Sequence, residues 1–417
     1  MKKIMTIAAV ALFATSAFAQ NPDAFKQIKK AKTADEVNTV LSSSESSMSA
    51  SENAQAYNKL VDFAMSSVNS AQTTIQTNEL KKQMGQEVTE TVDMKAFYND
   101  LYVAYVAALK CDKYDSQPNE KGKVPLKFRK SNGDRLYNFR PYLVNAGQEA
   151  QNADDNKSAS QYYGMYVATA KSDLFKTQVE AAAKAAADGV GDQYLSEVAR
   201  VASLTTFNEG DLRMAQFYAD VVMEDKAKEK EGLNLKLYFI EKGVKTHEDS
   251  LRCLGQLNDL YKKYPADSDV FARLAQWYSN LGQTDKQNEL IEERLKSDPE
   301  NFTAWAMKGQ AEMNAQKYDE ALTSLKKAMT CEASEESQKA LVDTFIGYCY
   351  TQKSTQLDKY DDQVNLLKEA IPYLEEAKKL DPNRERCNWA YPLYNCYYYV
   401  NGEKDAKTLE LKELLGL

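Results

Sequence analysis

Pairs of side-chain amides recur four residues apart along this chain, a spacing that places both members on one face of an α-helix. The amides in this pattern are Gln148 with Asn152, Gln276 with Asn280, and Gln310 with Asn314, while Asn208 and Gln352 occupy the second place alone. An amide both donates and accepts hydrogen bonds, so such a face can hold the backbone of an extended peptide without reading its side chains. The alternative is structural, because asparagine favours the end of a helix.

Residue types that perform catalysis are scarce in this sequence. His247 is the only histidine, which argues against histidine metal sites and histidine-dependent triads. Three acidic pairs lack the twelve-residue calcium-loop pattern: Asp154-Asp155, Glu292-Glu293 and Asp361-Asp362. The chain also lacks a glycine-rich phosphate loop and a GxSxG turn. We therefore expect a non-enzymatic protein without a cofactor or a bound metal.

The charge balance is acidic, with 53 Lys and Arg against 61 Asp and Glu and a net charge of −8. Because an acidic protein repels the phosphate backbone, we expect no nucleic-acid partner. One basic stretch, Lys121 to Lys130, interrupts this pattern. We interpret it as a solvated loop, and contact with an acidic ligand or with membrane headgroups is the alternative.

The start of the chain has the form of a secretory signal peptide. Lys2 and Lys3 precede an apolar run from Met5 to Phe13, and Ala17-Phe18-Ala19 forms a small-residue cleavage site. The run is too short to span a bilayer, and no later stretch reaches the length of a transmembrane segment. We expect cleavage after Ala19 and a periplasmic or secreted product. The absence of a cysteine at this junction argues against lipid-modified export.

Six cysteines follow the predicted cleavage site. Their even number and an oxidising compartment would permit disulfides. No CxxC pair occurs, and Cys253 and Cys349 lie within apolar helical patterns. A small thiol at such positions packs like alanine, so we favour buried free thiols over disulfide bridges.

Three windows of the chain align at a spacing of 34 residues, with Pro265 and Pro299 at their ends. The clearest window contains Trp305, Gly309, Tyr318, Ala321, Leu325 and Ala328. This pattern resembles the tetratricopeptide repeat family. Its small residues would let two antiparallel helices approach closely, while Trp305 fills the gap between them. The resemblance is strongest from Asn234 to Ala333.

This resemblance implies an all-α fold, a right-handed α-solenoid of antiparallel helical hairpins. The first helix of each hairpin would line a concave groove, and the amides would form a ladder along it. The implied function is that of an exported scaffold whose groove binds a peptide or a partner protein of the bacterial envelope. The alternative is a glycan-binding accessory of nutrient uptake, since one family of surface nutrient-binding proteins also contains such helices. That family is lipid-anchored and carries large non-helical insertions, and this sequence shows neither feature.

The mature chain is predicted to have two regions after the signal peptide of residues 1–19. Residues 20–133 form an N-terminal helical region that ends in a loop at 112–134, and residues 134–417 form the repeat array with C-terminal capping helices. Within the array we expect one single helix, Ala181 to Ala187, ended by Asp188-Gly189, and a polar loop from Lys353 to Val364.

Aromatic residues concentrate near the C-terminus, at Trp389, Tyr391, Tyr394, Tyr397, Tyr398 and Tyr399. We expect these rings to fill the seam between the last hairpins. An exposed binding surface is the alternative, because such rings combine a large apolar area with a polar tip.

Overall fold

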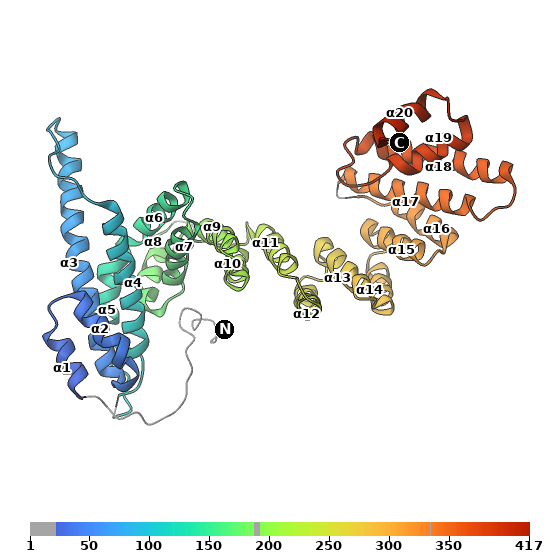
Figure 1. Cartoon of the computed structure of the whole chain (residues 1–417). Helices are drawn as coiled ribbons and strands as arrows, with labels where there is room; N and C mark the ends of the chain where they lie inside the picture. Colours follow the sequence, from blue (N-terminus) through green and yellow to red (C-terminus); the bar gives the residue numbers. More distant parts are fainter. Residues whose placement is uncertain (1–21, 120, 187–191, 334) are drawn as a thin grey trace. The chain divides into compact units, whose positions relative to one another are not determined.

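The protein is described by a computed structural model that covers residues 22–119, 121–186, 192–333 and 335–417. The predicted signal peptide, residues 1–19, and the predicted helix end at Asp188-Gly189 lie outside these residues. Every regular element within them is helical, which confirms the predicted all-α fold (Figure 1). Each of these helices is too short or too polar to cross a bilayer. The chain divides after Lys242 into two compact units, unit 1 and unit 2.

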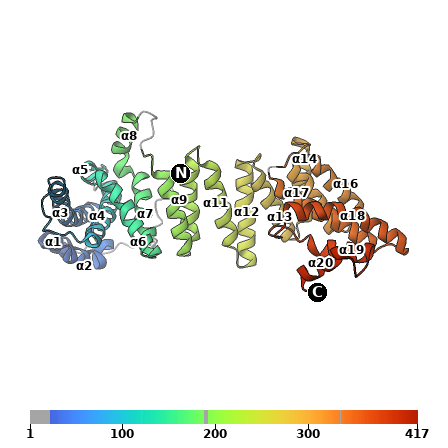
Figure 2. The ribbon, with the colours of Figure 1, turned by 90° about the horizontal axis from the view of Figure 1, so that it is seen from above.

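In its described residues, unit 1 consists of α-helices and three short 3-10 turns. The α-helices are α1 (Pro22–Lys30), α2 (Ala34–Ser44), α3 (Ala50–Gln83), α4 (Met94–Asp115), α5 (Arg129–Leu136), α6 (Arg140–Asn152), α7 (Asn156–Ala170), α8 (Lys176–Ala185), α9 (Leu195–Asn208), α10 (Leu212–Glu224) and α11 (Glu229–Lys242). The 3-10 turns are η1 (Glu45–Ser47), η2 (Tyr137–Phe139) and η3 (Asp173–Phe175). Figure 2 shows α6, α7, α9 and α11 in sequence along this unit.

One hydrophobic core runs through unit 1 from Ala24 to Val222. Helices α3 and α4 form its long antiparallel pair, and α3 buries Tyr57, Leu60 and Val61 on the predicted 3.6-residue face. The N-terminal helices therefore share a core with the hairpins that follow them. The compact unit extends to Lys242, whereas the sequence placed the start of the repeat array at residue 134.

The loop predicted at residues 112–134 is too long, because α4 continues to Asp115 and α5 begins at Arg129. Two hydrogen bonds of 2.6 and 2.9 Å join the Arg129 guanidinium to the Asp112 carboxylate. The backbone N–H of Phe128 also donates to Asp115 Oδ2 at 2.7 Å. Arg129, near the end of the basic stretch, is thus ion-paired within unit 1. The composition of this segment did not predict that ion pair.

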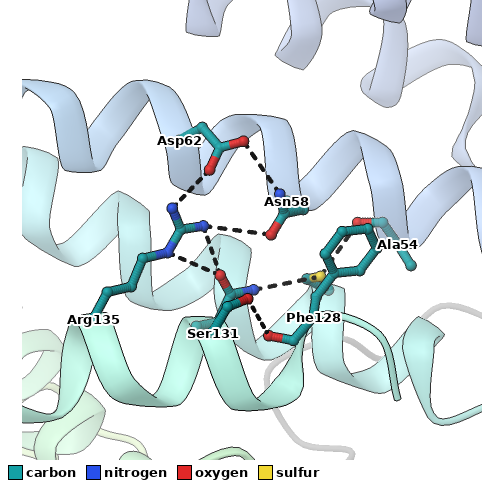
Figure 3. A network of polar contacts seen from close by, with 8 residues as sticks. Ala54, Asn58, Asp62, Phe128, Ser131 and Arg135 are labelled. Atoms are coloured by element: carbon teal, nitrogen blue, oxygen red, sulfur yellow. Dashed lines mark hydrogen bonds and ion pairs between the residues drawn. The ribbon is translucent and has the colours of Figure 1, made fainter. Parts of the chain in front are cut away.

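Polar contacts hold α5 against α3, as Figure 3 shows. Arg135 Nη1 donates to Asp62 Oδ1 at 2.7 Å, and Nη2 donates to Asn132 Oδ1 at 2.6 Å. Asn132 Nδ2 in turn contacts the sulfur of Cys111 at 3.7 Å. Because α5 contains Ser, Asn and Gly, its helix propensity is low. These tertiary contacts therefore stabilise a helix that local sequence disfavours.

Unit 2 contains nine α-helices within its described residues. They are α12 (His247–Lys263), α13 (Ser268–Asn280), α14 (Thr284–Ser297), α15 (Phe302–Asn314), α16 (Tyr318–Met329), α17 (Glu336–Ser354), α18 (Tyr360–Leu380), α19 (Ala390–Asn401) and α20 (Ala406–Leu415). From α13 onward they form consecutive hairpins, and the first helices α13, α15, α17 and α19 also contact one another in order. These helices form the stack of hairpins that the resemblance implied for this part of the chain. The first of the three 34-residue windows, however, falls on α11 and α12, which belong to different units.

The hairpin of α15 and α16 packs through small residues, as predicted. A Cβ atom added at Gly309 would lie 2.5 Å from Leu325 Cγ and 3.1 Å from the Leu325 backbone nitrogen, so only glycine fits at this helix contact. Ala321 and Ala328 are fully buried. Trp305 is half-buried and donates its indole N–H to Pro299 O at 2.8 Å.

The polar loop predicted from Lys353 to Val364 is too long, because only residues 355–359 lie outside the helices. Helix α17 continues to Ser354 and α18 begins at Tyr360, so the extra residues lengthen both helices of one hairpin. Asp361 and Asp362 lie in the first turn of α18, where acidic side chains favour the positive end of the helix dipole. Tyr360 Oη also donates to Tyr399 O at 3.0 Å, which ties the start of α18 to α19.

The C-terminal aromatic cluster divides into core and surface. Trp389 is 1% exposed, and its indole N–H donates to Asp381 O at 2.7 Å. Tyr397 is also buried, whereas Tyr391 and Tyr399 are half exposed. The prediction of core packing is therefore confirmed for Trp389, and the outer tyrosines lie on the surface.

All six cysteines are buried and unpaired. Burial raises the pKa of the thiols of Cys111, Cys349 and Cys396 to about 12. Since the thiolate is the reactive form, these thiols are unreactive near neutral pH. Their burial agrees with the prediction from the apolar helical patterns.

Candidate peptide-binding face

Five of the predicted amides lie on three successive first helices of unit 2. Gln276 and Asn280 are on α13, Gln310 and Asn314 are on α15, and Gln352 is on α17. Helix α13 contacts α15, and α15 contacts α17, so the five amides belong to one continuous row of helices. Gln276, Asn280 and Asn314 are exposed, and Gln310 and Gln352 are half-buried. We call this set the amide face.

The remaining predicted amides lie in unit 1. Gln148 and Asn152 are exposed on α6, and Asn208 is exposed at the end of α9. Helix α9 packs chiefly on α7 and α10, so its main neighbours do not include the helix that carries Gln148. The adjoining first helices of unit 2 therefore carry five of the eight predicted amides.

Four first helices end in the same way, with asparagine as the last helical residue and a left-handed residue two positions later. The helix-ending asparagines are Asn152, Asn208, Asn280 and Asn314, and the left-handed residues are Asp154, Gly210, Gly282 and Gln316. In α13 the Gly282 N–H donates to Ser279 O at 2.9 Å, and the Gln283 N–H donates to Tyr278 O at 2.8 Å. The other three turns contain the same two bonds. This pattern is the Schellman motif.

In a Schellman motif the helix ends without any contribution from the asparagine side chain. In the motif the left-handed residue and two backbone hydrogen bonds close the turn, and none of these comes from an asparagine side chain. The side chains of Asn152, Asn208 and Asn314 make no hydrogen bond to any described residue. The Gln276 amide donates to Asn280 Oδ1 at 2.9 Å, which shows that the four-residue spacing brings both amides together. Helix termination therefore does not account for these side chains.

Charged side chains beside the amide face are paired with neighbouring hairpins. Lys308 Nζ on α15 lies 2.6 Å from Glu292 on α14, and Lys353 on α17 pairs with Asp319 on α16. These ion pairs lie at the surface, where each contributes about 0 to 1 kcal/mol. The five side chains of the amide face are themselves neutral, and each presents both a donor and an acceptor.

The acidic pairs and the lone histidine occupy structural positions. His247 is the first residue of α12, next to the Thr246 capping box. Asp155 caps α7 by accepting from the Ser158 N–H at 3.0 Å, and Glu292 pairs with Lys308. No group of three or more potential metal ligands forms within the described residues.

Sequence reasoning missed two buried polar sites. Arg140 and Asp192 form an ion pair of 2.6 Å in unit 1, and both side chains are less than one-tenth exposed. Asp343 of unit 2 is 2% exposed, and its Oδ2 has no hydrogen-bond partner among the described residues. The residues around Asp192 and Asp343 in the sequence do not indicate that either acid is buried. Only the packing of distant helices shows it.

The segment from 302 to 333, which includes α15 and α16, matches the tetratricopeptide repeat family model. No curated protein matches the chain. Among solved structures, the chain is similar to human IFIT1 with m7Gppp-AAAA, at 17% identity and a TM-score of 0.40, over 79% of this chain and 74% of that chain. It is also similar to a tetratricopeptide repeat protein from Parabacteroides merdae ATCC 43184, at 13% identity and a TM-score of 0.26, over 67% and 99% of the two chains.

A third similar structure is the P58(IPK) TPR domain, at 13% identity and a TM-score of 0.22, over 83% of this chain and 98% of that domain. These likenesses are remote and assign no ligand to this chain. The repeat match covers one hairpin, that of α15 and α16, and further helical hairpins stack on it in unit 2. This part of the chain is therefore a stack of helical hairpins, one of which matches the tetratricopeptide repeat.

Proposed function

We propose that this chain is an exported, non-enzymatic scaffold, and that the amide face of unit 2 binds an extended segment of a partner protein of the bacterial envelope. Stacked helical repeats build open surfaces that hold other chains. The observation that carries the proposal is the use of backbone bonds to end the first helices, which leaves exposed amides on adjoining helices.

Amides suit an extended peptide because a peptide backbone also presents donors and acceptors in alternation. The neutral character of the face favours hydrogen bonding to backbone over selection of charged side chains. We infer that partner segments can vary in sequence as long as they bind in an extended form.

The partner can be located by site-specific photo-crosslinking. A photoreactive amino acid at Gln310 on the amide face should trap an envelope protein when the mature chain is mixed with envelope extract. The same group at Gln148 on α6 is the control, since it also replaces a glutamine amide on a first helix. Mass spectrometry then identifies the crosslinked segment of the partner.

A synthetic peptide of that segment allows affinity to be measured by fluorescence anisotropy. Joint replacement of Gln276, Asn280, Gln310 and Asn314 by alanine should weaken binding by tenfold or more and leave the melting temperature nearly unchanged. Joint replacement of Gln148, Asn152 and Asn208 by alanine should leave the affinity unchanged. Equal affinity of the first variant and the wild type would refute the proposal, and so would a collapse of its melting temperature.

Export is tested separately by N-terminal sequencing of the protein recovered from the source cell. The proposal expects the mature sequence Gln20-Asn21-Pro22 in the periplasm or the medium. An intact Met1 in the recovered protein would contradict it.

A further inference from the structure

Unit 1 contains a hollow of about 540 Å³ beside Arg140, between η2, α6, α7, α8 and the segment before α9. Its walls come from elements that are far apart in sequence. Sites for small molecules commonly have volumes of roughly 300 to 1,000 Å³. The Arg140 hollow is therefore large enough for a compact ligand, and it is separate from the amide face.

Arg140 is a buried cation at the wall of this hollow, with a side chain only 5% exposed. Its Nε donates to Thr169 Oγ1 at 2.9 Å, and its Nη2 donates to Asp192 Oδ2 at 2.6 Å. The guanidinium carbon lies 4.2 Å from the centre of the Tyr166 ring. Nη1 has no hydrogen-bond partner among the described residues. A fixed donor group is thus available beside the hollow.

Asp192 cancels the charge of Arg140. Besides the bond from Arg140, its Oδ1 accepts from Tyr166 Oη at 2.7 Å and from the Tyr194 N–H at 3.3 Å. Because both oxygens are satisfied and adjacent to the guanidinium, an anionic ligand would meet a carboxylate as well as a cation. A neutral acceptor, such as a hydroxyl group, can use the Arg140 donor without this repulsion.

The other walls combine amides, aromatic rings and small apolar groups. Asn138 and Gln193 are exposed, and their side chains make no hydrogen bond to any described residue. Tyr194 is 69% exposed, and α8 contributes the methyl groups of Ala182 and Ala185. Planar amides can bond to the hydroxyls of a ring, while a tyrosine ring packs against its C–H face.

We propose that the Arg140 hollow binds a neutral hydroxylated ring, namely one monosaccharide unit of a glycan. Arg140 Nη1 donates to a ring hydroxyl, Asn138 and Gln193 bond to its neighbours, and Tyr194 covers the C–H face. The Arg140–Asp192 pair holds these groups in place without giving the site a net charge.

Saturation-transfer NMR on the purified mature chain tests this site with glucose, galactose, mannose and N-acetylglucosamine as probes. At least one of the four should show transfer to its ring C–H protons, whereas glycerol and acetate should show none. Tyr194→Ala should weaken binding of that sugar by tenfold or more. Tyr194 is exposed, so this change leaves the core of unit 1 intact.

Tyr391→Ala is the matched control, because Tyr391 is also an exposed tyrosine but belongs to unit 2. It should leave sugar binding unchanged. The proposal is overturned if none of the four sugars binds, if acetate or glycerol binds as well as the best sugar, or if Tyr194→Ala and wild type bind that sugar equally. No peptide is present in this experiment, so its failure would leave the peptide-binding proposal untouched.

Discussion

Two regions of this protein bury a carboxylate in different ways. In unit 1, Asp192 accepts hydrogen bonds from Arg140, Tyr166 and the Tyr194 backbone. In unit 2, Asp343 lies on α17 with a 2% exposed side chain, and its Oδ2 has no partner among the described residues. The charge of Asp192 is therefore balanced by a cation, whereas the charge of Asp343 can be removed only by protonation.

The surroundings of Asp343 favour its protonated form. Burial, together with the nearby negative charge of Glu376 on α18, raises the pKa of this carboxyl from 3.8 to about 7, while Lys339 of α17 opposes the shift. The Cys387 thiol and the Asp381 carboxylate lie on the adjoining loop, where they bond to each other. Asp343 therefore changes charge near neutral pH.

The two units can be followed separately during unfolding. Trp277, Trp305 and Trp389 are the three tryptophans of the chain, and all belong to unit 2. Tryptophan emission therefore reports the unfolding of unit 2, while far-UV circular dichroism reports both units. The two signals together therefore show in which unit each of the following substitutions changes stability.

The largest effect is expected for Arg140→Met in unit 1. This change leaves Asp192 buried without its cation, which costs about 3 to 5 kcal/mol of the free energy of unfolding. Urea titration should show an earlier transition in circular dichroism and no change in tryptophan emission.

Arg135→Met is the matched control for this arginine. Its partner Asp62 is 54% exposed, so loss of the network in Figure 3 should cost about 1 kcal/mol. Equal losses for Arg135 and Arg140 would show that burial of Asp192 has no special cost.

Asp343→Asn should stabilise unit 2 at pH 8 by about 2 to 4 kcal/mol. The pKa of Asp343 is higher in the folded chain, so the folded state binds more protons between about pH 4 and pH 7. Wild-type stability must therefore fall as the pH rises through this window. The variant should lack this fall, and the two proteins should have similar stability near pH 4, measured by tryptophan emission in urea.

Glu376→Gln supplies a graded test of the same acid. Removal of this nearby negative charge should move the pH window of the wild type downward and stabilise unit 2 by less than Asp343→Asn does. Identical pH profiles for wild type and Asp343→Asn would contradict our description of this region.

The smallest effects concern the backbone and provide a baseline for both units. Gln316→Gly in unit 2 and Asp154→Gly in unit 1 should each stabilise by about 0.5 to 1 kcal/mol, because both residues have a positive φ, 60° and 56°. The melting temperature and the two urea transitions measure these gains. Similar gains in the two units would show that their different responses to Arg140→Met and Asp343→Asn arise from buried charge.

Gly282→Ala is the reverse substitution at an equivalent turn. No atom lies within 4 Å of the position that a new Cβ would take, so the change tests backbone strain alone. A loss of about 1 kcal/mol is expected, and an unchanged melting temperature would contradict the requirement for a left-handed residue here.

Local pattern was sufficient to predict the hairpin of α15 and α16. Gly309, Ala321 and Ala328 lie where two helices meet, and their small size is visible in the sequence at repeat spacing. The amide positions on first helices were also readable, because i and i+4 share a helix face. The sequence could not predict that these amides lie on the neighbouring helices α13, α15 and α17, because that depends on which helices contact one another.

Tertiary contacts explain the predictions that failed. The segment from 129 to 136 has loop-like composition, yet Arg135 and Arg129 bond to acids of α3 and α4 and stabilise it as α5. The loop before residue 360 is shorter than predicted, and the Tyr360 side chain at the start of α18 is bonded to Tyr399 of α19. Composition describes a segment by itself, and it contains no information about partners from distant helices.

By itself the sequence determined the helical class and the 34-residue hairpins, because helix periodicity and small contact residues act over a few turns of chain. Only the tertiary structure decided which acids are buried, which cation neutralises Asp192, and which amides adjoin. Charge burial and surface continuity depend on groups that are distant in sequence and close in space.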